Sequence, residues 1–164
     1  MKNAFSKVFI ACVFIATIAG LSSCSKSSSN SAPNTQGQNA TFTFTITMPA
    51  SIPANGVINI VVGGVDPTNI KNQNLWKITG AAQINQSDIQ LDASSFPLGK
   101  TTTVTIQSQV PLIDMNVDFA VVKLSPAIVF TYSPEINGSI VSADVINNLS
   151  VTTDLDKNLR YNMK

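Results

Sequence analysis

Polar and apolar side chains alternate without a break from Thr41 to Met48. Because successive side chains of a β-strand point to opposite faces, this period of two predicts a strand with one buried face and one face of threonines. Residues 101–110 repeat the pattern, with Val104, Ile106 and Val110 on the apolar side. Each segment is therefore expected to cover a core and to expose a row of threonines.

Shorter apolar runs follow along the chain. Val57–Val62 is rich in β-branched residues and is expected to form a strand that stops at Gly63-Gly64, since paired glycines often mark turns. Ser95–Gly99 is expected to be a loop that inserts Phe96 into the core. Further strands are expected at 75–79, 88–91, 117–124, 127–132, 139–145 and 149–153, with a frayed strand or tail at 154–164.

The number and spacing of these segments indicate the fold class. Residues 117–124 and 127–132 are apolar on both faces, which is typical of central strands, and Asn137-Gly138 predicts a tight turn. About seven to nine short strands without an amphipathic helix predict an all-β fold, an antiparallel β-sandwich of the immunoglobulin-like Greek-key kind. A jelly roll or another Greek-key order would give the same pattern.

The first residues of the chain have a different character. Lys2 and Lys7 precede Val8–Ala19, an apolar run of about twelve residues, which is the layout of a secretory signal peptide. A transmembrane helix needs about twenty apolar residues, so this run is too short to span a bilayer. The segment is expected to direct export.

Small residues and a cysteine end this leader. Leu21-Ser22-Ser23-Cys24 resembles the lipobox of bacterial lipoproteins, with an aliphatic residue three positions before the cysteine. The resemblance implies cleavage before Cys24, a thioether-linked diacylglycerol on its sulfur and acylation of the new amino terminus. Each buried methylene contributes about 0.8 kcal/mol, so two or three acyl chains anchor a protein durably. An ordinary secreted protein, or an uncleaved signal anchor, is the alternative.

The resemblance also divides the chain. Residues 1–23 would be the signal peptide, 24–39 the lipidated cysteine with a flexible polar linker, and 40–164 the sandwich domain. The linker composition predicts a coil with an end-to-end distance of about 20 Å. Cys24 is followed by Ser25 and Lys26, and the lack of aspartate there is similar to the outer-membrane signal of Gram-negative lipoproteins. We therefore expect an outer-membrane anchor, facing either the periplasm or the outside.

Composition excludes several chemistries. The chain has no histidine, and its two cysteines, Cys12 and Cys24, fall in the leader and at the lipidation site. Histidine-dependent general-base catalysis, Ser-His-Asp or Cys-His sites and ordinary zinc sites are thereby excluded. We expect no enzymatic activity and no cofactor. After loss of Lys2 and Lys7, eight basic residues face nine acidic ones, a net charge of −1, and no basic cluster suggests nucleic-acid binding.

Acidic residues offer weak candidates for a metal site. Asp114, Asn116 and Asp118 supply oxygen ligands at alternate positions, as a calcium loop does, and 154–158 offers a similar set. Neither segment has the glycine at position six or the acid at position twelve that such a loop needs. The pairs Asp114/Asp118 and Asp88/Asp92 could in principle serve as glycosidase carboxylates. The expected role of all these residues is surface solvation.

Trp76 is a weak candidate for ligand binding. With Tyr132 and Tyr161 it could form an aromatic platform for a sugar ring. Core packing is the expected role, since a sandwich core needs a tryptophan at least as often. The threonine rows could likewise form a flat polar face for a repetitive ligand, or could simply face water.

These features together predict a lipid-anchored, non-enzymatic β-sandwich of the cell envelope that acts as a binding or structural module. One alternative is a pilin-like or adhesin-like subunit that assembles through an edge strand such as Thr41–Met48. The other is a carbohydrate-binding accessory lipoprotein. The expected partners are the membrane, through the anchor, and a glycan or another envelope protein.

Intact-mass analysis of the mature protein tests the anchor. We expect the wild type to begin at Cys24, to carry acyl mass and to fractionate with the outer membrane, and Cys24→Ala to lose both properties. Protease treatment of whole cells on the same samples distinguishes a surface domain from a periplasmic one. A wild-type protein without added mass, found in the soluble fraction, would contradict the lipobox interpretation.

Overall fold

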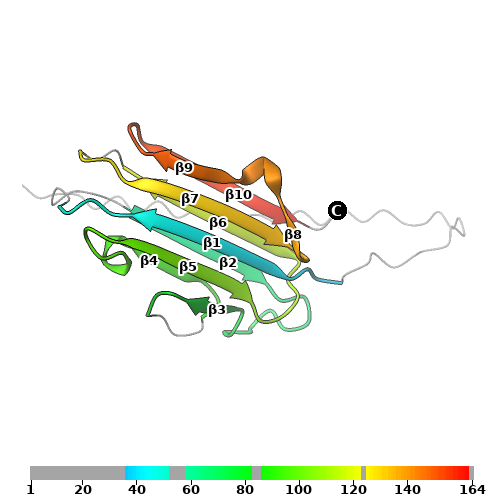
Figure 1. Cartoon of the computed structure of the whole chain (residues 1–164). Helices are drawn as coiled ribbons and strands as arrows, with labels where there is room; N and C mark the ends of the chain where they lie inside the picture. Colours follow the sequence, from blue (N-terminus) through cyan, green and yellow to red (C-terminus); the bar gives the residue numbers. More distant parts are fainter. Residues whose placement is uncertain (1–35, 52–57, 83–85, 123–124, 163–164) are drawn as a thin grey trace, which may run out of the picture. The chain divides into compact units, whose positions relative to one another are not determined.

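The computed structural model describes residues 36–51, 58–82, 86–122 and 125–162, which form two antiparallel sheets packed as a sandwich (Figure 1). The six-stranded sheet has the order β3-β5-β1-β7-β8, with β9 also paired to β7, and the four-stranded sheet has the order β10-β6-β2-β4. The expected all-β sandwich is confirmed. The elements are β1 (Ala40–Thr47), β2 (Ile58–Val65), β3 (Trp76–Thr79), β4 (Ile89–Asp92), η1 (Ala93–Ser95), β5 (Thr101–Ser108), β6 (Asp114–Val121), β7 (Val129–Ile136), β8 (Ser139–Ile140), η2 (Ser142–Asp144), β9 (Ile146–Ser150) and β10 (Leu155–Asn162).

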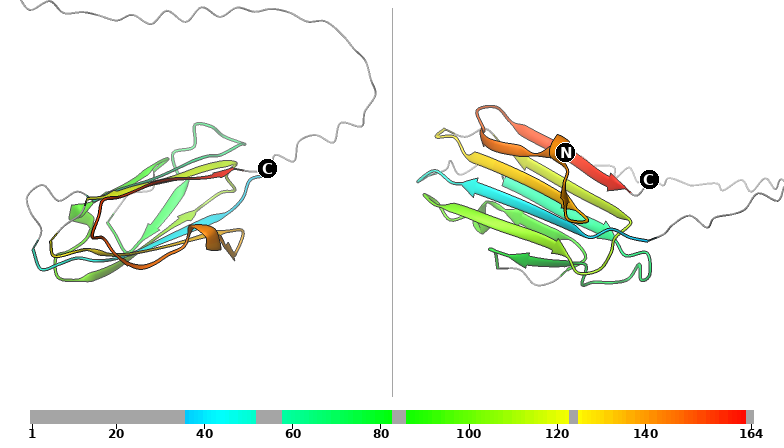
Figure 2. Two further views of the ribbon diagram at one scale, coloured as in Figure 1. Left: turned by 90° about the horizontal axis from the view of Figure 1, so that it is seen from above. Right: turned by 45° about the vertical axis from the view of Figure 1, so that its right-hand side comes forward.

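Successive strands from β1 to β7 alternate between the two sheets, whose layers are seen from above in Figure 2. The connection from β7 to β8 stays within one sheet. There Asn137 and Gly138 have φ angles of 50° and 77°, the left-handed pair that a tight hairpin turn requires. The turn expected at these two residues is confirmed.

The core lies between the sheets and follows the alternation of the sequence. Phe42, Phe44 and Ile46 of β1 are fully buried, and the threonines between them face outward. Phe96 enters the core from the loop after η1, as expected. The four-stranded sheet contributes the buried residues Ile58, Ile60, Val62, Ile89, Leu91, Met115, Val117, Phe119, Val121 and Tyr161.

An aromatic cluster joins the two sheets. The ring of Phe44 lies 4.9 Å from Tyr132 of β7 and 6.4 Å from Phe119 of β6. The rings of Phe42 and Tyr161 of β10 are 5.4 Å apart. Since Phe119 and Tyr161 belong to the four-stranded sheet, these contacts cross the sandwich, and aromatic pairs of this kind add about 0.5–1.5 kcal/mol each beyond buried area.

The expected end of the second strand at Gly63-Gly64 is wrong. β2 continues through both glycines to Val65, while Val57 lies outside the described residues. The glycines are needed for close packing: a Cβ on Gly63 would lie 2.5 Å from Oδ1 of Asn116, and one on Gly64 would lie 2.7 Å from the Leu112 side chain. Glycine here marks a crowded strand and not a turn.

The C-terminal third also differs from expectation. In place of one strand over 139–145, the two-residue β8 is followed by η2, and β9 covers Ile146–Ser150 where a strand over 149–153 is expected. Where a frayed strand or tail is expected at 154–164, the eight-residue strand β10 pairs along its whole length with β6. Its polar appearance arises because only Leu155, Leu159 and Tyr161 face inward with apolar side chains.

Three details of the long strands need correction. β6 runs over Asp114–Val121 with one buried and one partly exposed face, so it is central in its sheet without being buried on both faces. β5 ends at Ser108, and Val110 lies beyond it, half-buried. β1 lies between β5 and β7, so Thr41–Met48 does not form an edge strand.

The two buried tyrosines give a test of the packing between sheets. The hydroxyl groups of Tyr132 and Tyr161 are 3.0 Å apart. Tyr161→Phe leaves the fully buried Tyr132 hydroxyl without this partner and should lower the free energy of unfolding by about 1–3 kcal/mol. Tyr132→Phe should cost less, because Tyr161 retains 8% exposure and can reach water.

Denaturant unfolding of both single variants and the double variant measures this coupling. The double variant should lose less stability than the sum of the two single variants, since the second change removes a group that is already unpaired. Strict additivity, or a larger cost for Tyr132→Phe, would contradict the assigned contact.

Candidate functional site

The outer surface of the six-stranded sheet carries a regular array of hydroxyl groups. Thr45 of β1 is opposite Thr103 of β5, with their Oγ1 atoms 3.0 Å apart, and Thr47 and Thr101 form a second pair at 2.8 Å. Thr131 of β7 lies on the other side of Thr45. We call this surface the hydroxyl face; it consists of Thr41, Thr43, Thr45, Thr47, Thr79, Thr101, Thr103, Thr105, Thr131 and Ser133.

Strand geometry gives the hydroxyl face a two-dimensional repeat. Neighbouring strands lie about 4.8 Å apart, and side chains two residues apart on one strand are separated by about 6.8 Å. Thr79, Thr105, Thr43 and Ser133 therefore form one row across four strands. The β1 threonines are half-buried between their neighbours, whereas Thr101 and Thr103 are exposed.

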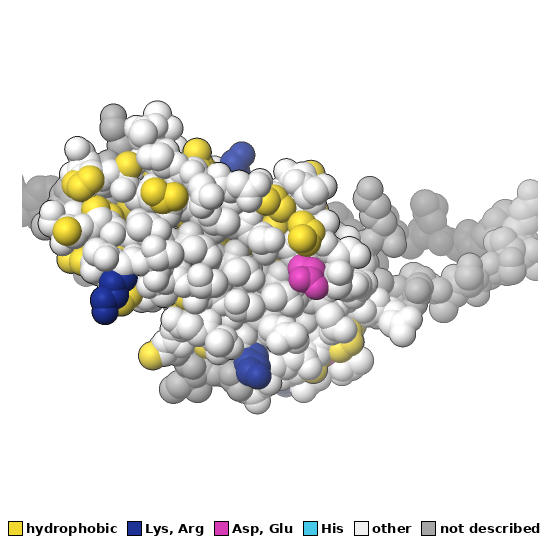
Figure 3. Space-filling view, in the orientation of Figure 1, with side chains coloured by type: hydrophobic (Ala, Val, Ile, Leu, Met, Phe, Trp, Pro, Cys, Tyr) yellow, Lys and Arg dark blue, Asp and Glu magenta, His cyan; other side chains and the backbone are white. Residues whose placement is uncertain are grey.

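Charged groups lie at the rim of this face. Lys77 and Glu135 are at opposite ends of the row that contains Gln107 and Thr41. Figure 3 views the molecule from the side of the six-stranded sheet, and the middle of this surface is formed by side chains that are neither charged nor hydrophobic. The face can therefore offer hydrogen bonds to a ligand without a strong electrostatic preference.

The proposed calcium ligands lie on the opposite sheet. Asp114, Asn116 and Asp118 occupy alternate outward positions of β6, not a loop. Asp114 accepts hydrogen bonds from Arg160 Nε at 3.0 Å and Nη2 at 2.6 Å, which lower the pKa of its carboxyl group. Asp118 accepts hydrogen bonds from the side-chain amides of Asn116 and Asn158. Each carboxylate thus binds groups of the protein, and the side chains stand side by side along the strand.

The other acidic residues do not gather into a metal site. Among residues 36–51, 58–82, 86–122 and 125–162, no three His, Cys, Asp or Glu side chains lie close enough to hold an ion. In the second carboxylate pair, Asp92 accepts a hydrogen bond from the backbone N–H of Ser94 at 2.9 Å and so caps η1. Oδ1 of Asp88 lies beside Gly63 of the neighbouring strand.

The three residues of the expected aromatic platform do come together, but inside the core. Trp76 and Tyr132 have no exposed surface, and Tyr161 is 8% exposed. All three surround Phe42, at ring distances of 5.7, 6.4 and 5.4 Å. The three rings form a packing cluster, in agreement with the core role expected for Trp76, because a buried indole presents no face on which a sugar could stack.

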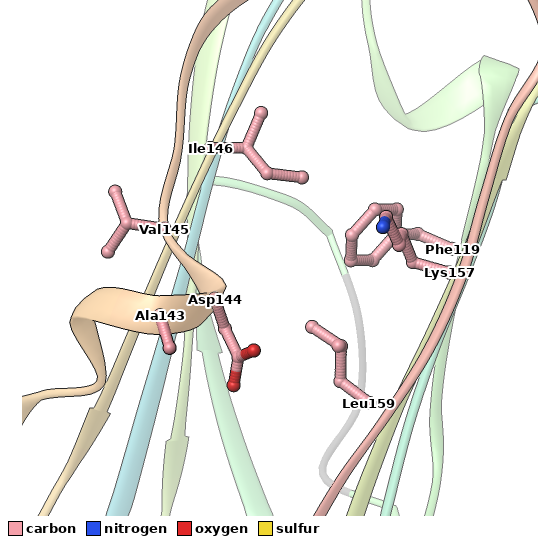
Figure 4. A pocket seen from close by; sticks show the side chains of 7 residues that line it. All are labelled: Phe119, Ala143, Asp144, Val145, Ile146, Lys157 and Leu159. Carbon is pink, nitrogen blue, oxygen red and sulfur yellow. The ribbon is translucent and has the colours of Figure 1, made fainter.

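A small cavity that no sequence motif predicts opens between the sheets. Its volume is about 220 Å³, which is smaller than that of most ligand pockets, about 300–1,000 Å³. Figure 4 shows the Asp144 carboxylate directed towards Leu159 of β10, and Ile146 directed towards Phe119. Residues from three distant parts of the chain build it: Phe119, Ala143, Asp144, Val145, Ile146, Lys157 and Leu159. Because these parts meet only in the folded chain, no local signal could have revealed it.

Asp66 organises the loop after β2. Its carboxylate accepts hydrogen bonds from the backbone and hydroxyl groups of Thr68 at 2.8 and 2.7 Å, from the Asn69 backbone at 3.1 Å and from the Asn72 amide at 2.9 Å. These hydrogen bonds lower the pKa of Asp66 to about 2, and the bond from Asn72 makes the largest contribution. The loop borders a second cavity of about 250 Å³, which Gln36 and Pro111 also line.

Comparison with protein-family models, curated proteins and solved structures found no match for this chain. Within the part of the chain that the structure describes, no helix has the length and apolar character needed to cross a membrane. Since no related protein was found, we infer the chemistry of the site from its geometry alone.

The lowered pKa of Asp66 predicts an acid-dependent loss of stability. A carboxylate with a lower pKa in the folded state stabilises the fold above its unfolded value of about 3.9, and this contribution is lost as the pH falls towards 2. Asp66→Asn should therefore unfold at a lower temperature than wild type at pH 6. The difference should shrink between pH 4 and pH 2, as measured by thermal unfolding. A difference that does not depend on pH would show that the Asp66 charge does not stabilise the loop.

Proposed function

We propose that this protein is a lipid-anchored, non-enzymatic binding module of the bacterial envelope, and that the hydroxyl face binds a neutral polysaccharide. The single observation that carries the proposal is the uncharged array of threonine and serine hydroxyls across β3, β5, β1 and β7. The anchor and its outer-membrane location rest on the resemblance of residues 21–24 to a lipobox.

The chemistry of the face favours a ligand rich in hydroxyl groups. A threonine hydroxyl is both a donor and an acceptor, as a sugar hydroxyl is. In the pair Thr45–Thr103 one hydroxyl donates to the other, so one O–H group and several lone pairs remain for a ligand. A strongly anionic or cationic polymer would find no opposite charge in the middle of this face, which favours a neutral one.

The strength of such binding follows from the absence of aromatic side chains among the residues that form the face. A hydrogen bond to a neutral group contributes about 0.5–1.5 kcal/mol net, so a single domain would bind a sugar segment weakly. Many copies anchored in one membrane would bind a long polymer together, and such multivalency can raise the overall affinity by about 10²–10⁴. The linker expected at 24–39 would allow each domain to turn towards the polymer.

The strand order bears on the other interpretations of the sequence. Assembly through Thr41–Met48 is not proposed again, because both edges of β1 are paired. The expected immunoglobulin-like strand order is not confirmed. In that fold the first two strands pair within one sheet, whereas β1 and β2 here belong to different sheets. Catalysis is not proposed, since the sequence lacks histidine and the carboxylates of Asp92, Asp114 and Asp118 accept hydrogen bonds from other groups of the protein.

Binding to immobilised neutral polysaccharides tests the proposal. In Thr45→Val/Thr103→Val, two hydroxyls are replaced by methyl groups of the same shape, so the strands and their packing should persist. Loss of the hydrogen bonds made by two hydroxyls should weaken binding about tenfold, that is, by about 1.4 kcal/mol.

The matched control is Thr152→Val/Thr153→Val, which makes the same change at two exposed residues between β9 and β10. This control should bind like wild type. The proposal fails if no polysaccharide in a broad panel binds, or if the control and the hydroxyl-face variant weaken binding equally.

A further inference from the structure

The four-stranded sheet ends in a long edge strand. β10 pairs with β6 over all eight of its residues, and within the described residues no strand pairs with its other edge. The edge strands β3 and β4 have four residues each. An unpaired edge presents a row of backbone N–H and C=O groups that can pair with another strand.

Proteins usually protect such edges, and β10 lacks two of the usual devices. It contains no proline, and its register against β6 is continuous from Leu155 to Asn162, without a bulge. Its protection consists of three charged residues, Asp156, Lys157 and Arg160. Whether these charges oppose pairing depends on which residues they meet.

We propose that β10 pairs with β10 of a second copy of this chain, antiparallel and with Asn158 on the two-fold axis. Asp156 of each copy then lies opposite Arg160 of the other. The two four-stranded sheets become one continuous sheet. This inference rests on the β10 edge alone and does not depend on the hydroxyl face.

The register follows from sheet geometry and charge. To keep both cores on one side of the joined sheet, outward residues must pair with outward residues, so the axis must pass through a residue and not between two. An axis at Lys157 would place two ammonium groups together, and an axis at Leu159 would leave Asp156 opposite Asn162. Within β10 itself, Leu155–Asn162, only the axis at Asn158 among these three gives two opposite-charge pairs, which stabilise cross-strand contacts.

Arg160 is already oriented for this contact. Its Nε and Nη2 atoms donate to Asp114, and its side chain is 63% exposed. A guanidinium has five N–H donors, so others remain for a second carboxylate. Asp156 of the second copy would join Asp114 in binding one arginine.

The inward side of the edge also tolerates the contact. Lys157 would lie opposite Leu159 of the second copy, and its stem can pack along that leucine. The cavity of Figure 4 lies at this edge, and Asp144, which lines it together with Lys157, supplies a nearby opposite charge. The expected net charge of −1 for the mature chain gives little repulsion between copies.

Disulfide trapping in the native membrane tests the pairing. Residues directly opposite in an antiparallel pair have Cα atoms about 4.5–5.5 Å apart, within the range that a disulfide spans. Full-length Asn158→Cys should therefore form a covalent dimer under mild oxidation. Gln107→Cys, on the outer side of the other sheet, should not. The wild type serves as the background, since Cys24 is expected to carry lipid.

Charge reversal tests the register. Adding Asp156→Lys to Asn158→Cys places a lysine opposite Arg160 and should reduce the cross-linked fraction at least tenfold. Adding Glu135→Lys, an equal charge change on β7, should leave it unaltered, and circular dichroism checks that all variants fold. Absence of a cross-link in Asn158→Cys, or a cross-link that is insensitive to Asp156→Lys, would overturn the proposal.

Discussion

The contact between aromatic rings across the two sheets is the interaction on which the rest of the structure depends. The ring of Phe119 lies 5.3 Å from Tyr132, 5.1 Å from Phe130 and 6.4 Å from Phe44, so one ring of the four-stranded sheet packs against three of the other sheet. Burying the rings of β1 forces the residues between them outward. The hydroxyl face is thus the other side of the same alternation that builds the core, and its regularity follows from the regularity of the buried rings.

The same cluster fixes the edge of the other sheet. Tyr161 lies against Phe42 and its hydroxyl contacts that of Tyr132, which places β10 over the core. With Tyr161 inward, Asp156, Asn158 and Arg160 must face outward, in register with the polar residues of β6. The polar network on this sheet and the charge pattern of its free edge therefore follow from the inward orientation of Tyr161, together with Leu155 and Leu159.

The parts of the fold that could be predicted are those in which local pattern and tertiary environment agree. β1, β5 and the Asn137-Gly138 turn follow from period-two alternation and from the φ angles that a hairpin needs. Gly63-Gly64 is misleading because the sequence does not distinguish a glycine needed for close packing from one needed for a turn. β10 is expected only as a frayed strand or tail, because an edge strand needs few apolar residues, since one edge and one face meet water.

The candidate sites likewise divide into features that the local sequence predicts and features that depend on the folded structure. The threonine rows could be identified from the sequence, but their joining into one face required the register of β5, β1 and β7, which no local pattern contains. The expectation that Trp76 packs in the core agrees with its full burial, although periodicity alone tells which neighbours share its face and not whether that face is covered. The cavity beside β10 needs contacts between residues 119, 144 and 157, so it exists only after the chain has folded. Two surfaces are proposed for binding. The hydroxyl face repeats the two-residue period of a strand, which a local stretch of sequence contains. The β10 edge exists because β10 is the last strand of its sheet, which no local stretch of sequence contains.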